Sequence, residues 1–155
     1  MRWSEIGVQR CSVARTLSVI GERWTMLVLR EAFLRTRRFD DFQRRTGAPR
    51  PILADRLRML VEHDILERRP YGNHPARFEY RLTEKGLDLY PVVVSLLTWG
   101  DRWMPDDTDT PPVQLRHKSC GHLTHPELAC PECGAWVGAR DMSAIVADVE
   151  STATR

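Results

Sequence analysis

Three of the four cysteines and three of the five histidines lie in one stretch near the end of the chain, HKSCGHLTHPELACPECG (117–134). Two units of the form ligand-x-x-ligand-Gly repeat within it, HKSCG and CPECG. Each glycine lets the backbone turn so that its N–H groups can face a bound sulfur. His117, Cys120, Cys130 and Cys133 make a Cys₃His set, which is a normal tetrahedral ligand set for Zn²⁺. We therefore predict a zinc-ribbon-like segment with Zn²⁺ as its structural cofactor.

Other interpretations of this cluster stay open. His122 and His125 are spare donors, so the choice of histidine is not fixed by spacing. The CPEC pair could be a redox dithiol, although such pairs normally follow a strand and open a helix in a βαβ unit, which this sequence lacks. The segment could also fold without metal. A site with four protein ligands leaves no position for water, which argues against hydrolysis. A metal- or thiol-dependent redox protein or enzyme that uses this cluster is the alternative function.

The charge of the chain is unevenly distributed along its 155 residues. The net charge is +2, but residues 1–103 hold 19 Lys and Arg against 13 Asp and Glu, whereas residues 104–155 hold 4 against 8. Nearly all the basic residues are arginine, which suits contacts to phosphates and base edges. The first residues lack an apolar signal core, and no apolar run approaches ~18 residues. We expect a cytoplasmic protein with no membrane segment and with reduced thiols.

Hydrophobic periodicity predicts helices over residues 11–21, 22–34, 37–47 and 48–64. Ser12 is the expected N-cap of the first helix, and Gly21 ends it. In the second, we expect Leu34 on the inner side together with Trp24, Leu27 and Val28. In the fourth, Leu53, Leu57 and Leu60 are spaced i, i+4 and i+7, which predicts a buried stripe.

The period then changes from helix to strand. Residues 65–71 are short and strand-like, and YGNHP (71–75) is a turn signal. ARFEYRL (76–82) alternates apolar and polar side chains, which predicts the second strand of a β-hairpin with a basic outer face. Thr83 is the expected cap of one long helix to Trp103, kinked at Pro91. Its apolar stripe is too wide for one small domain to cover, so a partner subunit is expected there.

This order of elements, helices followed by a two-stranded hairpin, is that of a winged helix-turn-helix. That fold is mainly α with a small β-hairpin wing. In that fold one helix enters the major groove of DNA and the hairpin reaches sideways along the duplex. With the leucine stripe inward, Arg58 and Asp55 point toward the groove and Arg56 lies on a flank that suits a phosphate. Arg50 stands at the N-terminus of this helix. At the wing, His74 and Arg77 are placed to reach the minor groove. The predicted DNA-binding residues are therefore Arg50, Asp55, Arg56, Arg58, His74 and Arg77.

Residues 11–103 resemble the HxlR-type winged-helix transcription regulators, which are relatives of the MarR group. The stretches that carry the resemblance are CSVARTLSVIGERWTMLVLREAF, RRFDDFQRRTG, PILADRLRMLVEHDILERRPY, PARFEYRLTEKG and LLTWGDRW. The resemblance implies a homodimer that binds double-stranded DNA at a pseudo-palindromic operator, as repressor or activator of a nearby gene. It also implies that the first and last helices form the dimer interface. The interface residues expected from it are Val13, Leu17, Val93, Leu96, Trp99 and Trp103.

The chain departs from the family pattern at Pro49 and Pro51. The family usually has a small hydroxyl residue and a polar or basic residue at these positions. Proline offers no hydrogen-bond donor, so the operator contacts that the family makes at these two positions are not expected here. Arg50 is expected to make more of the contacts that recognise the bases.

Cys11 is the expected sensing residue. A helix N-terminus and the nearby Arg10 and Arg15 favour the reactive thiolate. In several members of the family that the chain resembles, a cysteine at the matching position senses oxidants or electrophiles. The alternative is a half-buried packing residue. A small-molecule effector bound between helices is expected ahead of the thiol as a signal, and metal at the C-terminal segment is the third route.

The sequence thus predicts a two-part organisation. Residues 1–103 form the winged helix-turn-helix and dimerisation domain, 104–113 a proline-rich acidic linker, 114–142 the zinc-ribbon-like segment and 143–155 a flexible tail. The predicted protein is a regulator and not an enzyme.

Overall fold

The computed structural model describes residues 3–72, 77–108 and 110–145. Contacts between Cα atoms divide the chain into two compact units, Met1–Pro105 and Asp106–Arg155, and each unit is described by itself. No helix among the described residues is long and apolar enough to cross a membrane.

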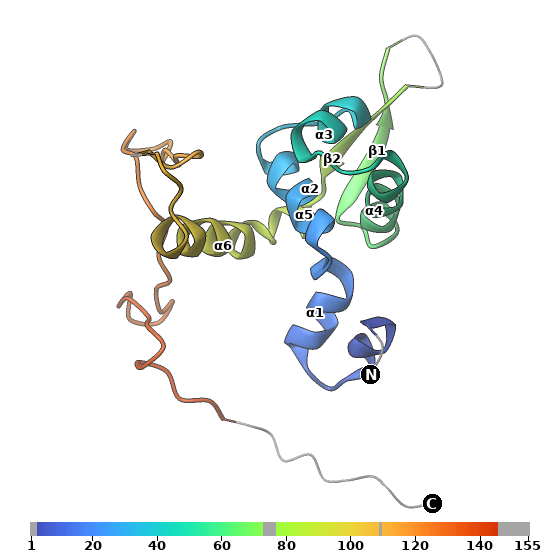
Figure 1. The fold of residues 1–155 in the computed structure, drawn as a ribbon. Helices are drawn as coiled ribbons and strands as arrows, with labels where there is room; N and C mark the ends of the chain where they lie inside the picture. Colours follow the sequence, from blue (N-terminus) through green and yellow to red (C-terminus); the bar gives the residue numbers. More distant parts are fainter. Residues whose placement is uncertain (1–2, 73–76, 109, 146–155) are drawn as a thin grey trace, which may run out of the picture. The chain divides into compact units, whose positions relative to one another are not determined.

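The first unit is mainly helical and carries a single β-hairpin (Figure 1). Its described residues form a 3₁₀ helix, then six α-helices and two strands. Their bounds are η1 (Trp3–Val8), α1 (Ser12–Ile20), α2 (Arg23–Phe33), α3 (Phe39–Thr46), α4 (Arg50–Glu62), β1 (Leu66–Pro70), β2 (Phe78–Leu82), α5 (Glu84–Leu87) and α6 (Tyr90–Trp103). This element order confirms the predicted winged helix-turn-helix.

The hydrophobic core lies where α2, α3 and α4 meet the hairpin. Leu53, Leu57 and Leu60 of α4 are fully buried, which confirms the predicted stripe. Phe42 of α3 is also fully buried, and its ring packs edge-on to Tyr80 of β2 at a centroid distance of 6.4 Å. Because each of these side chains removes its apolar surface from water, the core fixes α3 and α4 relative to the hairpin.

The hairpin pairs β1 with β2 in antiparallel register, from Leu66 opposite Leu82 to Pro70 opposite Phe78. An isolated bridge joins Arg38, just before α3, to Glu79 of β2. The hairpin, which we call the wing, is therefore tied to the segment that leads into α3. The predicted turn covers residues 71–75, and its part from residue 73 on, with His74, lies outside the described residues.

The prediction of one kinked helix over residues 83–103 is wrong. The chain forms two helices, α5 and α6, and Pro91 lies in the first turn of α6, where its missing N–H has no intrahelical partner to lose. The predicted Thr83 cap is confirmed, since its hydroxyl accepts from the N–H of Gly86 at 3.1 Å. A Cβ on Gly86 would lie 2.1 Å from the carbonyl oxygen of Ile65, so α5 approaches the start of the hairpin as only glycine allows.

Two local predictions at the ends of α1 and α2 are also wrong. The N-cap of α1 is Cys11, and Ser12 is the first helical residue, whose hydroxyl accepts from Arg15 at 3.2 Å. Leu34 is exposed because α2 ends at Phe33 and Leu34 is its C-cap. The inner position of Val28 is confirmed, and Trp24 and Leu27 are half-buried. The buried residues of α2 are Thr25, Val28, Leu29 and Glu31.

The second unit has no regular helix or strand among its described residues. Two isolated antiparallel bridges occur in it, Arg116 with Leu123 and Ala129 with Trp136. Residues 146–155 of the predicted tail lie outside the described residues.

Candidate nucleic-acid interface

The connection between α3 and α4 is a tight turn. Gly47 ends α3 in the left-handed region, with φ of 71°, and its N–H donates to the carbonyl of Gln43 at 2.9 Å. Ala48 is buried beneath the turn, and Pro49 is the N-cap of α4. A glycine C-cap and a proline at the next helix start suit an abrupt change of chain direction. The turn thus holds α4 at a fixed angle to α3.

The outer face of α4 carries the predicted base-reading residues. Ala54 and Arg58 are exposed on the side opposite the buried leucines. Arg58 donates to Asp55 at 2.5 Å and to Glu62 at 2.6 Å, and Arg56 pairs with the second oxygen of Asp55. Asp55, Arg56 and Arg58 therefore form one ion-pair cluster along the helix rather than three independent side chains.

This cluster shifts the ionisation of its members. The hydrogen bond from Arg58, and next that from Arg56, hold the pKa of Asp55 below its usual value. Glu62 and then Asp55 raise the pKa of Arg58. Asp55 is therefore charged at neutral pH and holds Arg58 along its own helix, so phosphates or bases would compete with it for the guanidinium N–H groups.

Arg50 packs against α3 instead of projecting freely. Its Nη1 donates to Asp40 and to Gln43, each at 3.1 Å, and its guanidinium lies 4.6 Å from the ring centroid of Phe39. Two-thirds of the side chain is still exposed. Arg50 is therefore held in one orientation at the N-terminus of α4, next to Pro51, which also lies exposed in the first turn.

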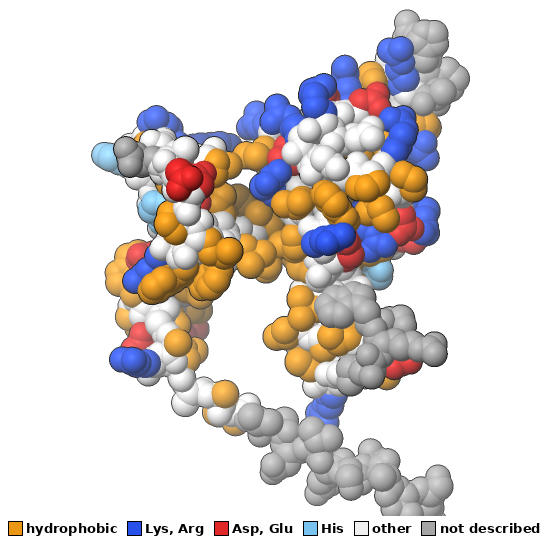
Figure 2. Space-filling view, viewed as in Figure 1, with side chains coloured by type: hydrophobic (Ala, Val, Ile, Leu, Met, Phe, Trp, Pro, Cys, Tyr) orange, Lys and Arg blue, Asp and Glu red, His pale blue; other side chains and the backbone are white. Residues whose placement is uncertain are grey.

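The wing carries further cations. Arg77 is exposed just before β2, and its carbonyl accepts from the N–H of Tyr71 at 2.9 Å. Arg68 is exposed on β1 with its guanidinium 3.5 Å from the ring centroid of Phe78, and Arg69 pairs with Glu67 at 2.6 Å. Figure 2 shows Lys and Arg side chains along the part of this unit that carries α3 and the wing.

Some cations on this side were not among the predicted site residues. Arg44 on α3 is largely exposed and pairs with Asp41, Arg38 lies 4.6 Å from the ring centroid of Tyr71, and Arg68 lies on the wing. The adjacent arginine pairs in RRFDDFQRR and LERRP were the available signal. A basic face assembled from α3, α4 and the wing is the electrostatic footprint of a phosphate-binding surface.

A buried carboxylate sets the position of α3. Glu31 is 3% exposed near the end of α2. It accepts from Arg30 at 2.8 Å and from the hydroxyl of Thr36 at 3.1 Å, and Arg45 of α3 lies 3.8 Å away. Since a buried charge must be paired, this network fixes the segment between α2 and α3.

The residues predicted for a dimer interface differ in exposure. Leu96, Trp99 and Trp103 on α6 and Val13 on α1 are each more than half exposed, and Leu17 is 37% exposed. Val93 is only 8% exposed and belongs to the core of its own chain. Leu96 and Trp99 also line an open apolar groove on α6 with Pro91, Val92 and Ser95.

Cys11, the predicted sensing residue, is an exposed free thiol at the N-cap of α1. Its side chain makes no capping hydrogen bond, so the sulfur is not engaged by the first turn of the helix.

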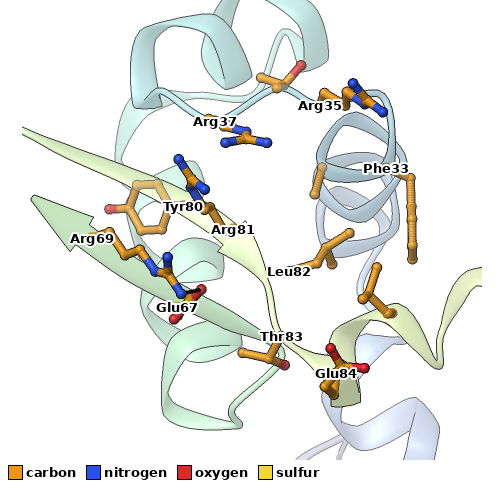
Figure 3. Close-up of a pocket in the computed structure, with 13 residues that line it drawn as sticks. Phe33, Arg35, Arg37, Glu67, Arg69, Tyr80, Arg81, Leu82, Thr83 and Glu84 are labelled. Carbon is orange, nitrogen blue, oxygen red and sulfur yellow. Dashed lines mark ion pairs between the residues drawn. The ribbon is translucent and has the colours of Figure 1, made fainter. Parts of the chain in front are cut away.

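A polar pocket of 640 Å³ opens between the end of α2, the wing and α5 (Figure 3). Its wall holds Arg35, Arg37, Arg69 and Arg81. Arg69 pairs with Glu67 within the pocket, whereas Arg35 and Arg37 have no ion-pair partner among the described residues. Glu84, which also lines the pocket, has no ion-pair partner among the described residues either, so the unpaired charge of the lining is positive by one.

The predicted metal ligands lie in two pairs within the second unit. Nδ1 of His117 is 3.3 Å from the sulfur of Cys120. Backbone N–H groups of Cys133 and Glu132, followed by the thiol of Cys133, lower the pKa of Cys130. Among the described residues, no three His, Cys, Asp or Glu side chains stand close enough to share one ion.

The sequence profile described as HxlR-like helix-turn-helix matches residues 19–108. The chain is similar to Rv3095 of Mycobacterium tuberculosis, an uncharacterised HTH-type transcriptional regulator. The two are 49% identical over 132 residues, which is 85% of this chain and 83% of that protein.

Two solved structures are also similar. PA1607, a putative transcription factor, superposes with a TM-score of 0.75 at 36% identity, over 88% of this chain and 94% of that chain. The redox regulator HypR in its reduced form gives a TM-score of 0.54 at 32% identity, over 59% of this chain and 92% of that one.

Proposed function

The chain belongs to the HxlR-like helix-turn-helix family of transcription regulators and is not an enzyme, and from this premise we propose that it acts as a homodimer that recognises a specific operator. The alternative of an enzyme built on the Cys/His cluster is excluded by this membership. One observation carries the proposal: the same unit has both an exposed recognition helix and a basic wing. The leucine side of α4 is fully buried, and its Arg58 side is exposed.

Two kinds of contact follow from this geometry. The exposed end and outer face of α4 would enter the major groove, where Arg50 and Arg58 are suited to guanine and Ala54 to a thymine methyl group. Arginines of α3 and of the wing, such as Arg44 and Arg77, would contribute mainly electrostatic attraction, Arg44 at phosphates and Arg77 in the negative potential of the minor groove. Because Pro49 and Pro51 offer no donor, the first turn of α4 would read DNA through Arg50.

The dimer is proposed from the apolar surface of α6. Leu96, Trp99 and Trp103 follow one another at helical spacing and remain open to solvent in a single chain. A contiguous apolar face of this kind marks an interaction site in a water-soluble regulator. A twofold partner would cover it and would set two α4 helices at the spacing of a pseudo-palindrome.

The test of DNA recognition compares two substitutions. Fluorescence anisotropy with the intergenic DNA beside the gene would be measured for Arg58→Ala and Arg77→Ala, each against the operator and against unrelated DNA. Arg58→Ala should reduce the preference for the operator, because a bidentate base contact discriminates by about 1–3 kcal/mol. Arg77→Ala should weaken binding to both DNAs alike.

A matched control is Arg140→Ala, which removes an arginine from the second unit. It should leave both affinities unchanged. If Arg58→Ala, Arg77→Ala and Arg140→Ala all behave as the unmodified protein, recognition by α4 and the wing is contradicted.

We propose two routes by which a signal would reach this DNA-binding surface. The first is a small anionic effector in the pocket that contains Arg35 and Arg37. It is favoured by the two cations without ion-pair partners there and by the position of the pocket against the wing. A panel of small carboxylates and phosphates would be screened by thermal shift. A ligand of this pocket should stabilise the protein but not the Arg37→Ala variant.

The second route is oxidation of Cys11. Its support is an exposed free thiol at the start of α1, together with the likeness to a redox regulator. Two Cys11 thiolates of a dimer would join in one disulfide, and the two electrons would pass to the added oxidant, diamide. Non-reducing electrophoresis should show a diamide-dependent covalent dimer that Cys11→Ser abolishes. A covalent dimer that persists in Cys11→Ser would remove Cys11 from the mechanism.

A further inference from the structure

The two ligand-x-x-ligand-Gly units of the second unit have the same backbone geometry. In the first, the N–H of His117 donates to the carbonyl of His122 at 2.9 Å, and the N–H of Gly121 donates to the carbonyl of His117 at 2.8 Å. In the second, thirteen residues on, Cys130 donates to Ala135 and Gly134 donates to Cys130, each at 2.8 Å. The motif repeat seen in the sequence is thus also a structural repeat.

The flanking contacts repeat at the same offset. The bridge between Arg116 and Leu123 corresponds to the bridge between Ala129 and Trp136. The two glycines have φ of 76° and 73°, in the left-handed region that glycine adopts without strain. Each unit is a tight turn closed by two hydrogen bonds, and we call the pair the two knuckles.

The first knuckle has its two donors close to the separation that one metal ion would give them. Nδ1 of His117 lies 3.3 Å from the sulfur of Cys120. Bond lengths of about 2.1 Å to nitrogen and 2.3 Å to sulfur at a tetrahedral angle would separate the two donors by about 3.6 Å. The other ring nitrogen, Nε2, lies 3.1 Å from the hydroxyl of Ser119. A partner on the second nitrogen is the usual means by which a ligating imidazole is held in orientation.

The second unit has no hydrophobic core to hold the knuckles in place. None of its described residues is buried. Leu123, Leu128 and Trp136 are each more than half exposed. A segment this short buries too little apolar surface to order itself, so another source of stability is needed.

We propose that the two knuckles close on one Zn²⁺ ion, held by Nδ1 of His117 and by the sulfurs of Cys120, Cys130 and Cys133. On binding, the three thiols lose three protons to solvent and the imidazole stays neutral, so the complex has a net charge of −1. In the structure the four donors form two separate pairs, and binding draws the pairs together across residues 122–129. The donor set is soft and complete, which favours Zn²⁺ over Mg²⁺ or Ca²⁺ and leaves no position for water.

This ion is structural and does not depend on the DNA-binding proposal. The winged unit has its own core, so loss of the metal leaves that unit folded. The spare histidines, His122 and His125, provide matched controls on the same segment.

The experiment measures metal content and coordination in the full chain. The metal content of protein purified under reducing conditions is measured by inductively coupled plasma mass spectrometry. Protein from which a chelator has removed the metal is then titrated with Co²⁺. We expect one Zn²⁺ per chain, and the intense ligand-to-metal and red d–d absorption bands of tetrahedral thiolate-bound Co²⁺. His117→Ala, Cys120→Ser, Cys130→Ser and Cys133→Ser should each weaken Co²⁺ binding by at least about tenfold, whereas His122→Ala and His125→Ala should not.

Two results would overturn the proposal. Protein that retains no zinc and shows no tetrahedral Co²⁺ spectrum at equimolar metal would show that the knuckles are not a metal site. Loss of binding in His122→Ala or His125→Ala, with His117→Ala unaffected, would show that the first knuckle does not hold the ion as its geometry indicates. Circular dichroism of each variant would verify that the helical unit stays folded.

Discussion

Replacing Trp99 with alanine should separate the proposed dimer without unfolding the monomer. Trp99 is 57% exposed on α6 and lies outside the core cluster, so its removal costs the single chain little. In a twofold dimer the same surface from both chains is buried, and each substitution therefore counts twice.

The size of the effect follows from the exposed fraction. Full burial of a large apolar side chain stabilises by up to about 3 kcal/mol, so the exposed part of Trp99 corresponds to about 1.5 kcal/mol. Two copies give about 3 kcal/mol, which is roughly a 100-fold rise in the Kd of the dimer.

Sedimentation equilibrium over a range of protein concentrations would measure this Kd. Trp136→Ala is the matched control, because Trp136 is similarly exposed but belongs to the second unit. The reasoning is refuted if Trp99→Ala leaves the Kd unchanged, or if Trp136→Ala raises it as much. A protein that is monomeric at every concentration would contradict the dimer itself.

Three further predictions concern the stability of the fold. Gly86→Ala should lower the free energy of unfolding by about 1–3 kcal/mol in denaturant melts, because the added Cβ would overlap a backbone carbonyl. Gly100→Ala in α6 is the control: its Cβ meets open space, so the free energy of unfolding should rise by about 0.5–1 kcal/mol. Glu31→Ala should cost about 2–3 kcal/mol by leaving its buried partners unpaired, and a melt within 0.5 kcal/mol of the unmodified protein would show that the network is dispensable. Since the pKa of Asp55 is lower in the folded state, its stabilisation is present above the pKa of the unfolded chain and is lost as pH falls below about 4. In Asp55→Asn, the free energy of unfolding should therefore fall slightly less steeply as the pH is lowered below about 4. An unchanged pH dependence would mean that the ion pair of Asp55 with Arg58 does not stabilise the fold.

Periodicity predicted the parts of the fold that depend on burial alone. Leu53, Leu57 and Leu60 share one buried face of a helix, as their spacing predicts. The alternation over residues 76–82 predicted a strand, and β2 runs over Phe78–Leu82. The end of α2 was not predictable in this way. Leu34 fits the helical stripe, but the chain leaves the helix one residue earlier, so the side chain faces solvent.

The split between α5 and α6 has a similar cause. A proline can kink a helix or begin one, and the sequence alone does not distinguish these outcomes. The approach of Gly86 to the hairpin fixes the short α5, and that contact is between residues about twenty positions apart. Local signals do not contain such contacts.

The candidate DNA surface was predictable in outline but not in its connections. The ion pairs of Arg58 with Asp55 and Glu62 follow from i, i+3 and i, i+4 spacing. The contacts of Arg50 with Asp40 and Phe39 depend on the angle between α3 and α4, which no local pattern specifies. The position of Arg50 was thus predicted, whereas its restraint by α3 was found only in the structure.

The most direct test of the central claim is the salt dependence of binding to the intergenic DNA beside the gene, measured with excess unrelated competitor. If each chain of a dimer neutralises three to five phosphates, the logarithm of the affinity should fall against the logarithm of salt with a slope of about −5 to −9. Tight, competitor-resistant binding with such a slope is the predicted result. Binding that competitor removes completely, or that does not change with salt, would contradict operator recognition by α4 and the wing.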